Sequence, residues 1–214
     1  WFKRVLAWPL ENILAKSTLV DEETKAKLIE ETADKIIPIL SEEAAKVPVS
    51  ESTVLAVDWM NGRRTPDASQ LVKGTITGLN LASSAPLIFR ALVEATAFGS
   101  KAIVDRFLEN GIKIESVIGI GGISLKSPFV MQTLADVLDM PIKVAKAEQA
   151  CAFGASMFAA VAAGIYAKIE DAQQAMGQGF AKEYKPNHEN HLAYLALYEK
   201  YRKLGNFTEN ELFH

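Results

Sequence analysis

The stretch Ser116-Val117-Ile118-Gly119-Ile120-Gly121-Gly122-Ile123-Ser124 decides the fold of this 214-residue chain. Its first five residues form a nearly continuous apolar run, which predicts a strand that is covered on both faces. The paired glycines predict a tight turn, and Pro128 marks the first position of a helix that continues to about Leu138. A second strand at 141–144 and a helix at 150–163 follow. This alternation predicts a parallel βαβα unit with right-handed crossovers.

The first 46 residues predict helices. Asp21 precedes two acidic residues and an apolar stripe that runs to Ile39, which is the pattern of a capped amphipathic helix. Pro38 is expected to kink or end that helix. The sequence predicts further elements around the βαβα unit: strands at 53–58 and 74–79 joined by an Asn61-Gly62 turn, and helices at 83–111 and 189–204. We therefore expect three segments: a helical lead-in at 1–46, the main lobe at 47–185 and a C-terminal helix at 186–214.

The composition excludes several classes of protein. Apolar residues make up 49% and charged residues 23% of the chain, which is typical of a globular domain. The net charge of −3 offers no basic field for a nucleic acid. The uncharged run Gln149–Ala167 consists mainly of small residues, which favours a buried helix over a membrane span.

The single cysteine, Cys151, cannot form an internal disulfide, and no secretory signal is visible. Both features predict a cytoplasmic protein. The opening at Trp1, without an initiator Met, suggests that the sequence begins inside a longer protein.

Two small-residue segments are candidate ligand contacts. Gly121 and Gly122 allow a ligand to approach the backbone closely, and ligands gather at the carboxyl ends of strands in open α/β sheets. The alternative, which spacing supports equally, is that they only permit a tight turn. In Ala150–Ser156, tight helix packing is favoured over ligand contact.

Several catalytic motifs are missing. The sequence lacks the phosphate loop G-x-x-x-x-G-K-S/T, and the dinucleotide fingerprint from Gly119 to Ser124 lacks its third glycine. An NAD-dependent enzyme is therefore a weak alternative. No carboxylate pair or Ser-His-Asp set stands out, and His188 with His191 offers too few ligands for a metal. The sequence thus predicts neither a catalytic residue nor a metal site within the chain.

Other polar residues are assigned structural roles. Asp58 ends a strand beside a turn and could face a cleft, but binding to the amides of the Asn61-Gly62 turn is favoured. Arg90 and Glu94, four residues apart, are expected to pair on a helix, and Gln132 and Asp136 are assigned to packing or solvent rather than to a ligand.

Taken together, these segments resemble the C-terminal half of the FGGY carbohydrate kinases, and within that family the bacterial L-ribulokinases. The stretch Asp58-Trp59-Met60-Asn61-Gly62 indicates the ribulokinase group, whereas Leu87 stands where the family signature usually has a polar residue. The matching stretches are Ala56–Arg64, Gly78-Leu79, Arg90–Gly99, Gly121-Gly122, Ser127-Pro128, Gln132, Ala135-Asp136 and Gln149–Ala155.

The resemblance implies an α/β fold of the actin/hexokinase/Hsp70 (ribonuclease H-like) type, in which a mixed sheet with flanking helices forms one lobe of an ATPase. It also implies ATP and Mg²⁺ as cofactors, which this lobe binds jointly with an N-terminal lobe. The N-terminal lobe carries the catalytic aspartate and most sugar contacts. The residues that the resemblance places against the nucleotide are Gly121, Gly122, Lys126, Cys151 and Gly154.

The implied substrate is the pentulose L-ribulose, and the chain alone is expected to be inactive. The oligomeric state stays open, a homodimer included. The alternatives are a non-catalytic ATP-binding or assembly lobe, or an FGGY kinase of the xylulose or glycerol type.

Overall fold

The computed structural model describes residues 1–213 and divides into two compact units. Unit 1 comprises Trp1–Gly99 and Ala196–His214, and unit 2 comprises Ser100–Leu195. Two long helices, α3 (Ala85–Glu109) and α8 (His188–Phe207), contribute residues to both units. The segment boundaries expected at 47 and 186 stay a prediction.

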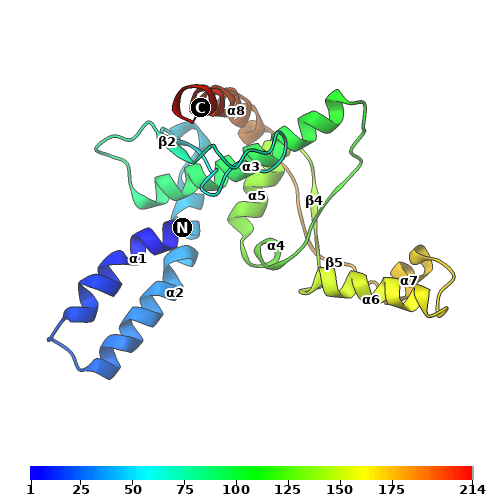
Figure 1. Cartoon of the computed structure of the whole chain (residues 1–214), viewed down its shortest axis with the longest axis horizontal. Coiled ribbons are helices and arrows are strands. Elements are labelled where there is room, and N and C mark those ends of the chain that lie inside the picture. Colours follow the sequence, from blue (N-terminus) through cyan, green and yellow to red (C-terminus); the bar gives the residue numbers. More distant parts are fainter. Residues whose placement is uncertain (214) are drawn as a thin grey trace. The chain divides into compact units, whose positions relative to one another are not determined.

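Unit 1 begins with a helical hairpin made of α1 (Phe2–Asn12), the 3₁₀ turn η1 (Leu14–Lys16) and α2 (Glu22–Lys46), which Figure 1 shows in blue. The predicted cap is confirmed, because Asp21 Oδ1 accepts a hydrogen bond from the backbone N–H of Thr24 at 2.9 Å. The expectation that Pro38 ends the helix is wrong. Pro38 is exposed, so water can satisfy the carbonyl that loses its partner, and the helix continues through it.

The rest of unit 1 packs a two-stranded ribbon with α3 and α8. The strands β1 (Leu55–Val57) and β2 (Thr75–Thr77) pair antiparallel, as the two predicted strand segments require. The predicted turn between them is confirmed: the N–H of Gly62, whose φ is +84°, donates to Trp59 O at 3.0 Å. The 3₁₀ turn η2 (Val49–Glu51) precedes β1, and the π-helical turn η3 (Thr208–Leu212) follows α8.

Unit 2 contains the predicted βαβα arrangement. The strands β3 (Val117–Gly119) and β4 (Ile142–Ala145) pair in parallel, with Gly119 opposite Val144. The helices that follow them are α4 (Gly122–Lys126) with α5 (Pro128–Leu138), and α6 (Ala150–Ala162). The expectation of a strand covered on both faces is wrong for Ile118, which is 52% exposed, because side chains alternate between the two faces of a strand and its neighbour Val117 is the one that packs against the core.

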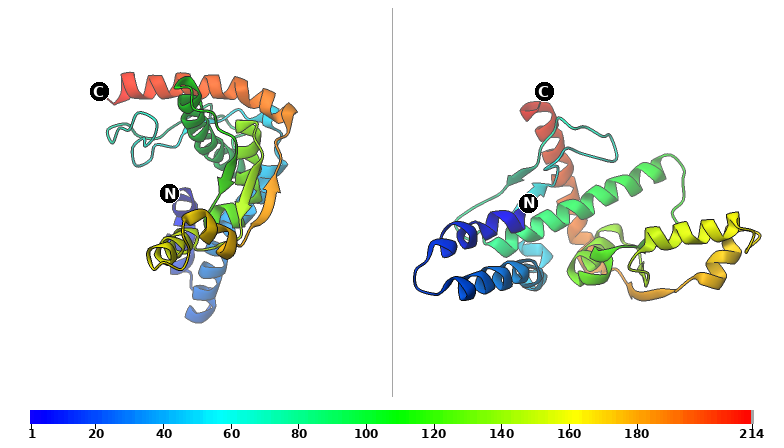
Figure 2. Two further views of the ribbon diagram at one scale, coloured as in Figure 1. Left: turned by 90° about the vertical axis from the view of Figure 1, so that its right-hand side faces the viewer. Right: turned by 60° about the horizontal axis from the view of Figure 1, so that its bottom comes forward.

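Three elements of unit 2 were not predicted: the short helix α4, which lies where only a turn was expected, and a further helix and strand near the C-terminal end of the unit. The helix α7 (Ile169–Met176) packs beside α6, as Figure 2 shows, and leads to β5 (Phe180–Tyr184). The strand β5 pairs antiparallel with β4 and makes the sheet mixed, in the order β3-β4-β5. The core of this unit lies on one face of the sheet and consists of Met131, Ala135, Ile142, Val144 and Tyr184.

Within residues 1–213, no helix combines the length and apolar character that a membrane crossing requires. The uncharged run that begins at Gln149 is divided between α6 and the turn before α7.

Candidate functional site

The topology of unit 2 brings the predicted ligand contacts to one edge of its sheet. Because β3 and β4 are parallel neighbours, their carboxyl ends meet at the same edge. Gly121 and Gly122 follow the end of β3, and α6 follows the end of β4. Figure 1 shows α4 and the beginning of α6 at the same end of β4. We call this side of the unit the strand-end edge, and it is where ligands bind in open α/β sheets.

The two glycines of the turn differ in what the fold requires. Gly121 has φ +86° and ψ 179°, a conformation that other residues rarely adopt, so the turn itself demands glycine there. Gly122 is not among the positive-φ glycines, and a Cβ added to it would meet no atom within 4 Å. Among residues 1–213, no atom would therefore clash with a side chain at position 122.

The glycine that precedes the turn has a packing role. A Cβ added to Gly119 would lie 2.9 Å from Met131 Cε and 3.2 Å from Ser124 Cβ. The side chain of Ser124 is itself fixed, because its hydroxyl donates to Gly121 O at 2.7 Å. Gly119 therefore lets α4 and α5 pack closely on β3, while Gly122 faces open space.

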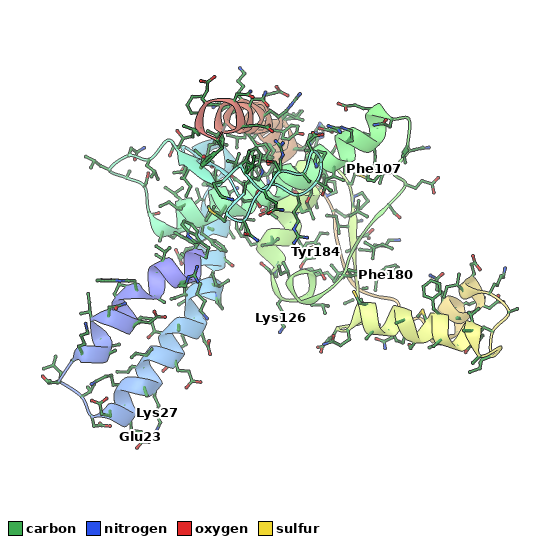
Figure 3. The ribbon with its side chains drawn as sticks, viewed as in Figure 1. Glu23, Lys27, Phe107, Lys126, Phe180 and Tyr184 are labelled. Atoms are coloured by element: carbon green, nitrogen blue, oxygen red, sulfur yellow. The ribbon has the colours of Figure 1, made fainter. Side chains whose placement is uncertain are left out.

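The remaining predicted contacts are exposed or half-buried at the same edge. Lys126 ends α4 and projects away from the ribbon, as Figure 3 shows. Cys151 is an exposed thiol in the first turn of α6. Gly154 is half-buried, and a Cβ there would meet nothing within 4 Å, as at Gly122. The site residues Gly121, Gly122, Lys126, Cys151 and Gly154 thus share one edge.

The predicted packing role of Asp136 is confirmed, at the far end of α5 from the glycine turn. Its carboxylate is buried and accepts hydrogen bonds from Gln132 Nε2 at 2.7 Å, Asn187 N at 2.8 Å and Asn190 Nδ2 at 2.9 Å. The Nδ1 atom of His191 lies 3.0 Å from Asp136 O. The carboxylate is therefore occupied in holding the start of α8 against α5.

The predicted Arg90–Glu94 pair is also confirmed, and it is buried. Arg90 Nε donates to Glu94 Oε1 at 2.7 Å, and Arg90 Nη1 donates to Ala44 O at 2.9 Å and to Val47 O at 2.6 Å. The hydroxyl of Ser52 donates to Glu94 Oε2 at 3.0 Å. This network ties the end of α2 to α3 and leaves both charged groups occupied by structural contacts.

The prediction for Asp58 is wrong. Its Oδ2 accepts a hydrogen bond from the Thr96 hydroxyl on α3 at 2.8 Å instead of binding the turn amides. Asp58 follows β1, and the tertiary structure places its carboxylate next to α3.

Burial raises the pKa of Tyr201 to about 12, and the negative charge of Asp58 adds to this effect.

The loop after β1 contains an ion pair that sequence reasoning missed. Arg63 makes a bidentate contact with Glu209 of η3, with N–O distances of 2.8 and 2.7 Å. The guanidinium carbon also lies 4.9 Å from the centroid of the Trp59 ring. Hydrogen bonding to Arg63 lowers the pKa of Glu209 below its usual range. These contacts fix the loop and give no sign of a ligand.

No cluster of three or more His, Cys, Asp or Glu side chains that could hold a metal ion occurs among residues 1–213. The chain's own residues at the strand-end edge offer glycine backbone, an amine and small side chains.

Solved structures define the class of protein to which this fold belongs. The chain is similar to a ligand-bound xylulose kinase from Lactobacillus acidophilus, with a TM-score of 0.74 and 24% identity over 92% of this chain and 37% of that one. It is similar to a glycerol kinase with ADP from Plasmodium falciparum, with a TM-score of 0.67 and 19% identity over 99% of this chain and 38% of that one. The fold is therefore that of a sugar-kinase C-terminal lobe, an actin-like ATPase fold.

The sequence comparisons identify the family. The model for the C-terminal domain of the FGGY family of carbohydrate kinases matches residues 2–163, and the chain belongs to this family. Kinases of this family use ATP. The chain is 46% identical to a ribulokinase of Vibrio parahaemolyticus over 98% of its length, and 38% identical to one of Bacillus licheniformis over 94%. It spans 36% of the length of each of these relatives.

Proposed function

We propose that this chain is the nucleotide-binding C-terminal lobe of an L-ribulokinase. The complete protein transfers the γ-phosphate of ATP to L-ribulose and forms L-ribulose 5-phosphate, a step of L-arabinose catabolism in the cytoplasm. The observation that carries this proposal is the 46% identity, over nearly the whole chain, to a protein named ribulokinase.

The strand-end edge is the part of the chain that serves this reaction. The backbone of Gly121 and Gly122 lies against the adenosine and phosphates of ATP, and the open space at Gly122 supports this role. Lys126 lies near the adenine, and Cys151 and Gly154 line the wall at the start of α6. These side chains bind and orient the nucleotide but move no proton.

The chemistry itself needs groups from the first lobe. Phosphoryl transfer requires an in-line hydroxyl, a base that accepts its proton and Mg²⁺ to balance the phosphate charge. We assign the base, most sugar contacts and closure over the substrate to the N-terminal lobe. The isolated chain therefore binds ATP weakly and has no kinase activity.

Two alternatives stay open. A different FGGY kinase, of the xylulose or glycerol type, agrees with the solved structures, but their identities of 24% and 19% support the fold alone. A non-catalytic ATP-binding or assembly lobe would share the fold and lack turnover in the complete protein.

Isothermal titration of the isolated chain with ATP tests the nucleotide site. We expect measurable binding that Gly122→Val weakens at least about tenfold, because the new side chain fills the space left for the ligand. Gly99→Ala, whose Cβ would meet only the Tyr201 hydroxyl at 3.9 Å, is the matched control and leaves binding unchanged. Absence of ATP binding by the unsubstituted chain would favour the assembly lobe.

ADP release by the complete protein tests the substrate. We expect kcat/KM to be highest for L-ribulose, compared with D-xylulose and glycerol, and no release above background by the isolated chain. A preference for D-xylulose or glycerol would reassign the protein within the family.

A further inference from the structure

The C-terminal end of α8 and the turn η3 contact the loop that joins β1 to β2. We call residues 205–212 the strap and residues 58–74 the loop, and both belong to unit 1. Figure 2 shows the loop, in blue-green, beside the red C-terminal end of α8 in both views. The two segments are far apart in the sequence, so the tertiary structure alone brings them together.

The first contact joins Gly205 of the strap to the ring of Trp59. A Cβ added to Gly205 would lie 3.0 Å from Trp59 Cη2 and 3.5 Å from Trp59 Cζ2. The indole is buried, with 8% of Trp59 exposed. Glycine inside a helix is less favourable than alanine, so helix propensity does not account for Gly205. The close approach of the Trp59 ring does account for it.

The second contact is the ion pair between Arg63 of the loop and Glu209 of the strap, which are 146 positions apart. The Nη1 and Nη2 atoms of Arg63 donate to the two carboxylate oxygens of Glu209. The Nε atom of the same guanidinium donates to Asp67 O, farther along the loop, at 2.7 Å. One guanidinium therefore connects the strap to two parts of the loop, while it also lies over the Trp59 ring.

The backbone pairing of the ribbon and its loop is short. The strands β1 and β2 contain three residues each, and a two-stranded ribbon is marginally stable by itself. Within the loop, Arg63 and Ser69 exchange two backbone hydrogen bonds at 2.8 and 3.0 Å. The strap adds a contact at the far end, where the buried Thr208 hydroxyl donates to Thr75 Oγ1 at 3.1 Å. The strap thus contacts the loop near its start and β2 directly after its end.

We propose that the strap holds the loop closed, and that breaking the Arg63–Glu209 ion pair opens the loop while the rest of unit 1 stays folded. The pair suits a reversible closure, because the Glu209 side chain is 39% exposed and water can solvate its carboxylate once it is released. The loop includes Asp58–Gly62, the stretch by which the chain resembles the ribulokinases, so closure fixes the conformation of that stretch. This inference does not depend on the proposed nucleotide site.

Backbone amide hydrogen exchange in the full chain tests this inference. The probes are the amides of Arg63 and Ser69, which are hydrogen-bonded inside the loop. Glu209→Gln removes the charge and nearly keeps the shape, and we expect both amides to exchange about tenfold faster. Glu211→Gln makes the same change at an exposed residue of η3 and is the matched control, for which we expect rates within about twofold of the unsubstituted chain.

Two further measurements separate a strap from a contact that only stabilises the whole unit. In low urea, the loop amides of the unsubstituted chain should keep their rates while those of the buried Ala95 and Phe98 in α3 accelerate, because a local opening exposes little surface. In an Arg63→Met chain, adding Glu209→Gln should change loop exchange by less than about twofold, because the pair is already broken. Thermal unfolding confirms that the variants fold.

Three results would overturn the inference. If Glu209→Gln exchanges as Glu211→Gln does, the ion pair does not hold the loop. If only residues 206–213 exchange faster, the pair orders the strap alone. If the loop amides accelerate in urea together with those of α3, the loop opens only when unit 1 unfolds, and this measurement requires no variant. None of these results bears on ATP binding, so the proposed function is tested separately.

Discussion

The Arg90–Glu94 network of unit 1 and the strand-end edge of unit 2 use charged residues in opposite ways. In the network, the side chains of Arg90 and Glu94 are 4% and 2% exposed and bind each other and the surrounding backbone. At the edge, Lys126 is exposed and Gly122 faces open space. Buried charge that is fully partnered maintains the fold, whereas open, unpartnered charge is available to a ligand.

The largest expected effect comes from breaking the buried network. Arg90→Met leaves the Glu94 carboxylate buried without its cation, so we expect the free energy of unfolding to fall by about 3–5 kcal/mol. Urea unfolding followed by tryptophan fluorescence measures this. Arg106→Met, in the exposed last turn of α3, is the control. A loss below 1 kcal/mol would show that the network adds little to stability.

Alkaline pH is expected to destabilise unit 1 through Tyr201. Burial raises the pKa of Tyr201 from 10.0 to about 12 in the folded chain. Between these two pH values the phenol is neutral in the folded chain and ionised in the unfolded chain. The contribution of neutral Tyr201 to the free energy of unfolding is fully present below pH 10. It is lost as the pH rises toward 12, and the loss is at most about 3 kcal/mol. Chemical unfolding at pH 9 and pH 11.5 measures the loss. Tyr201→Phe should flatten this dependence, and an unchanged slope would contradict the assignment.

Two glycines sharpen the contrast between packing and ligand contact within unit 2. Gly119→Ala would place a Cβ 3.2 Å from Ser124 Cβ and 2.9 Å from the flexible end of the Met131 side chain, so we expect a loss of about 1 kcal/mol in unfolding free energy. Gly122→Ala meets no atom of the chain and is expected to be neutral or to stabilise α4 by up to about 1 kcal/mol. Thermal and urea unfolding compare the two. Equal destabilisation would mean that Gly122 also serves packing.

The smallest effect is expected for an exposed pair with the same spacing as Arg90 and Glu94. Glu23 and Lys27 on α2 are also four residues apart, but their side chains are 79% and 72% exposed (Figure 3). Lys27→Gln should cost about 0.3–0.5 kcal/mol at low salt and less at high salt. Urea unfolding at two salt concentrations checks this. A cost near that of Arg90→Met would contradict the comparison, because burial would then not determine how much an ion pair contributes to stability.

Much of the fold was predictable because it depends on local pattern. The strand before Gly121, the Pro128 helix start, the Asp21 cap and the Asn61-Gly62 turn each follow from a few adjacent residues, and the structure confirms them. The strand β5 escaped prediction because Phe180–Tyr184 lacks a hydrophobic alternation, and its partner β4 lies more than 30 residues earlier in the chain.

The candidate site was only partly predictable. The sequence placed Gly121 and Gly122 at a strand end, where ligands bind, but could not separate a turn glycine from a ligand glycine. To distinguish the two kinds of glycine, one must know which atoms would surround an added Cβ, and those atoms belong to residues elsewhere in the chain.

The sequence alone determined the order of helices and strands in the βαβα unit and the spacing that allows Arg90 to pair with Glu94. These properties arise from interactions between residues close along the chain. Only the tertiary structure decided that this pair is buried while Glu23 and Lys27 are exposed, and that Asp58 binds Thr96. Burial and strand register join distant segments, and no local pattern specifies them.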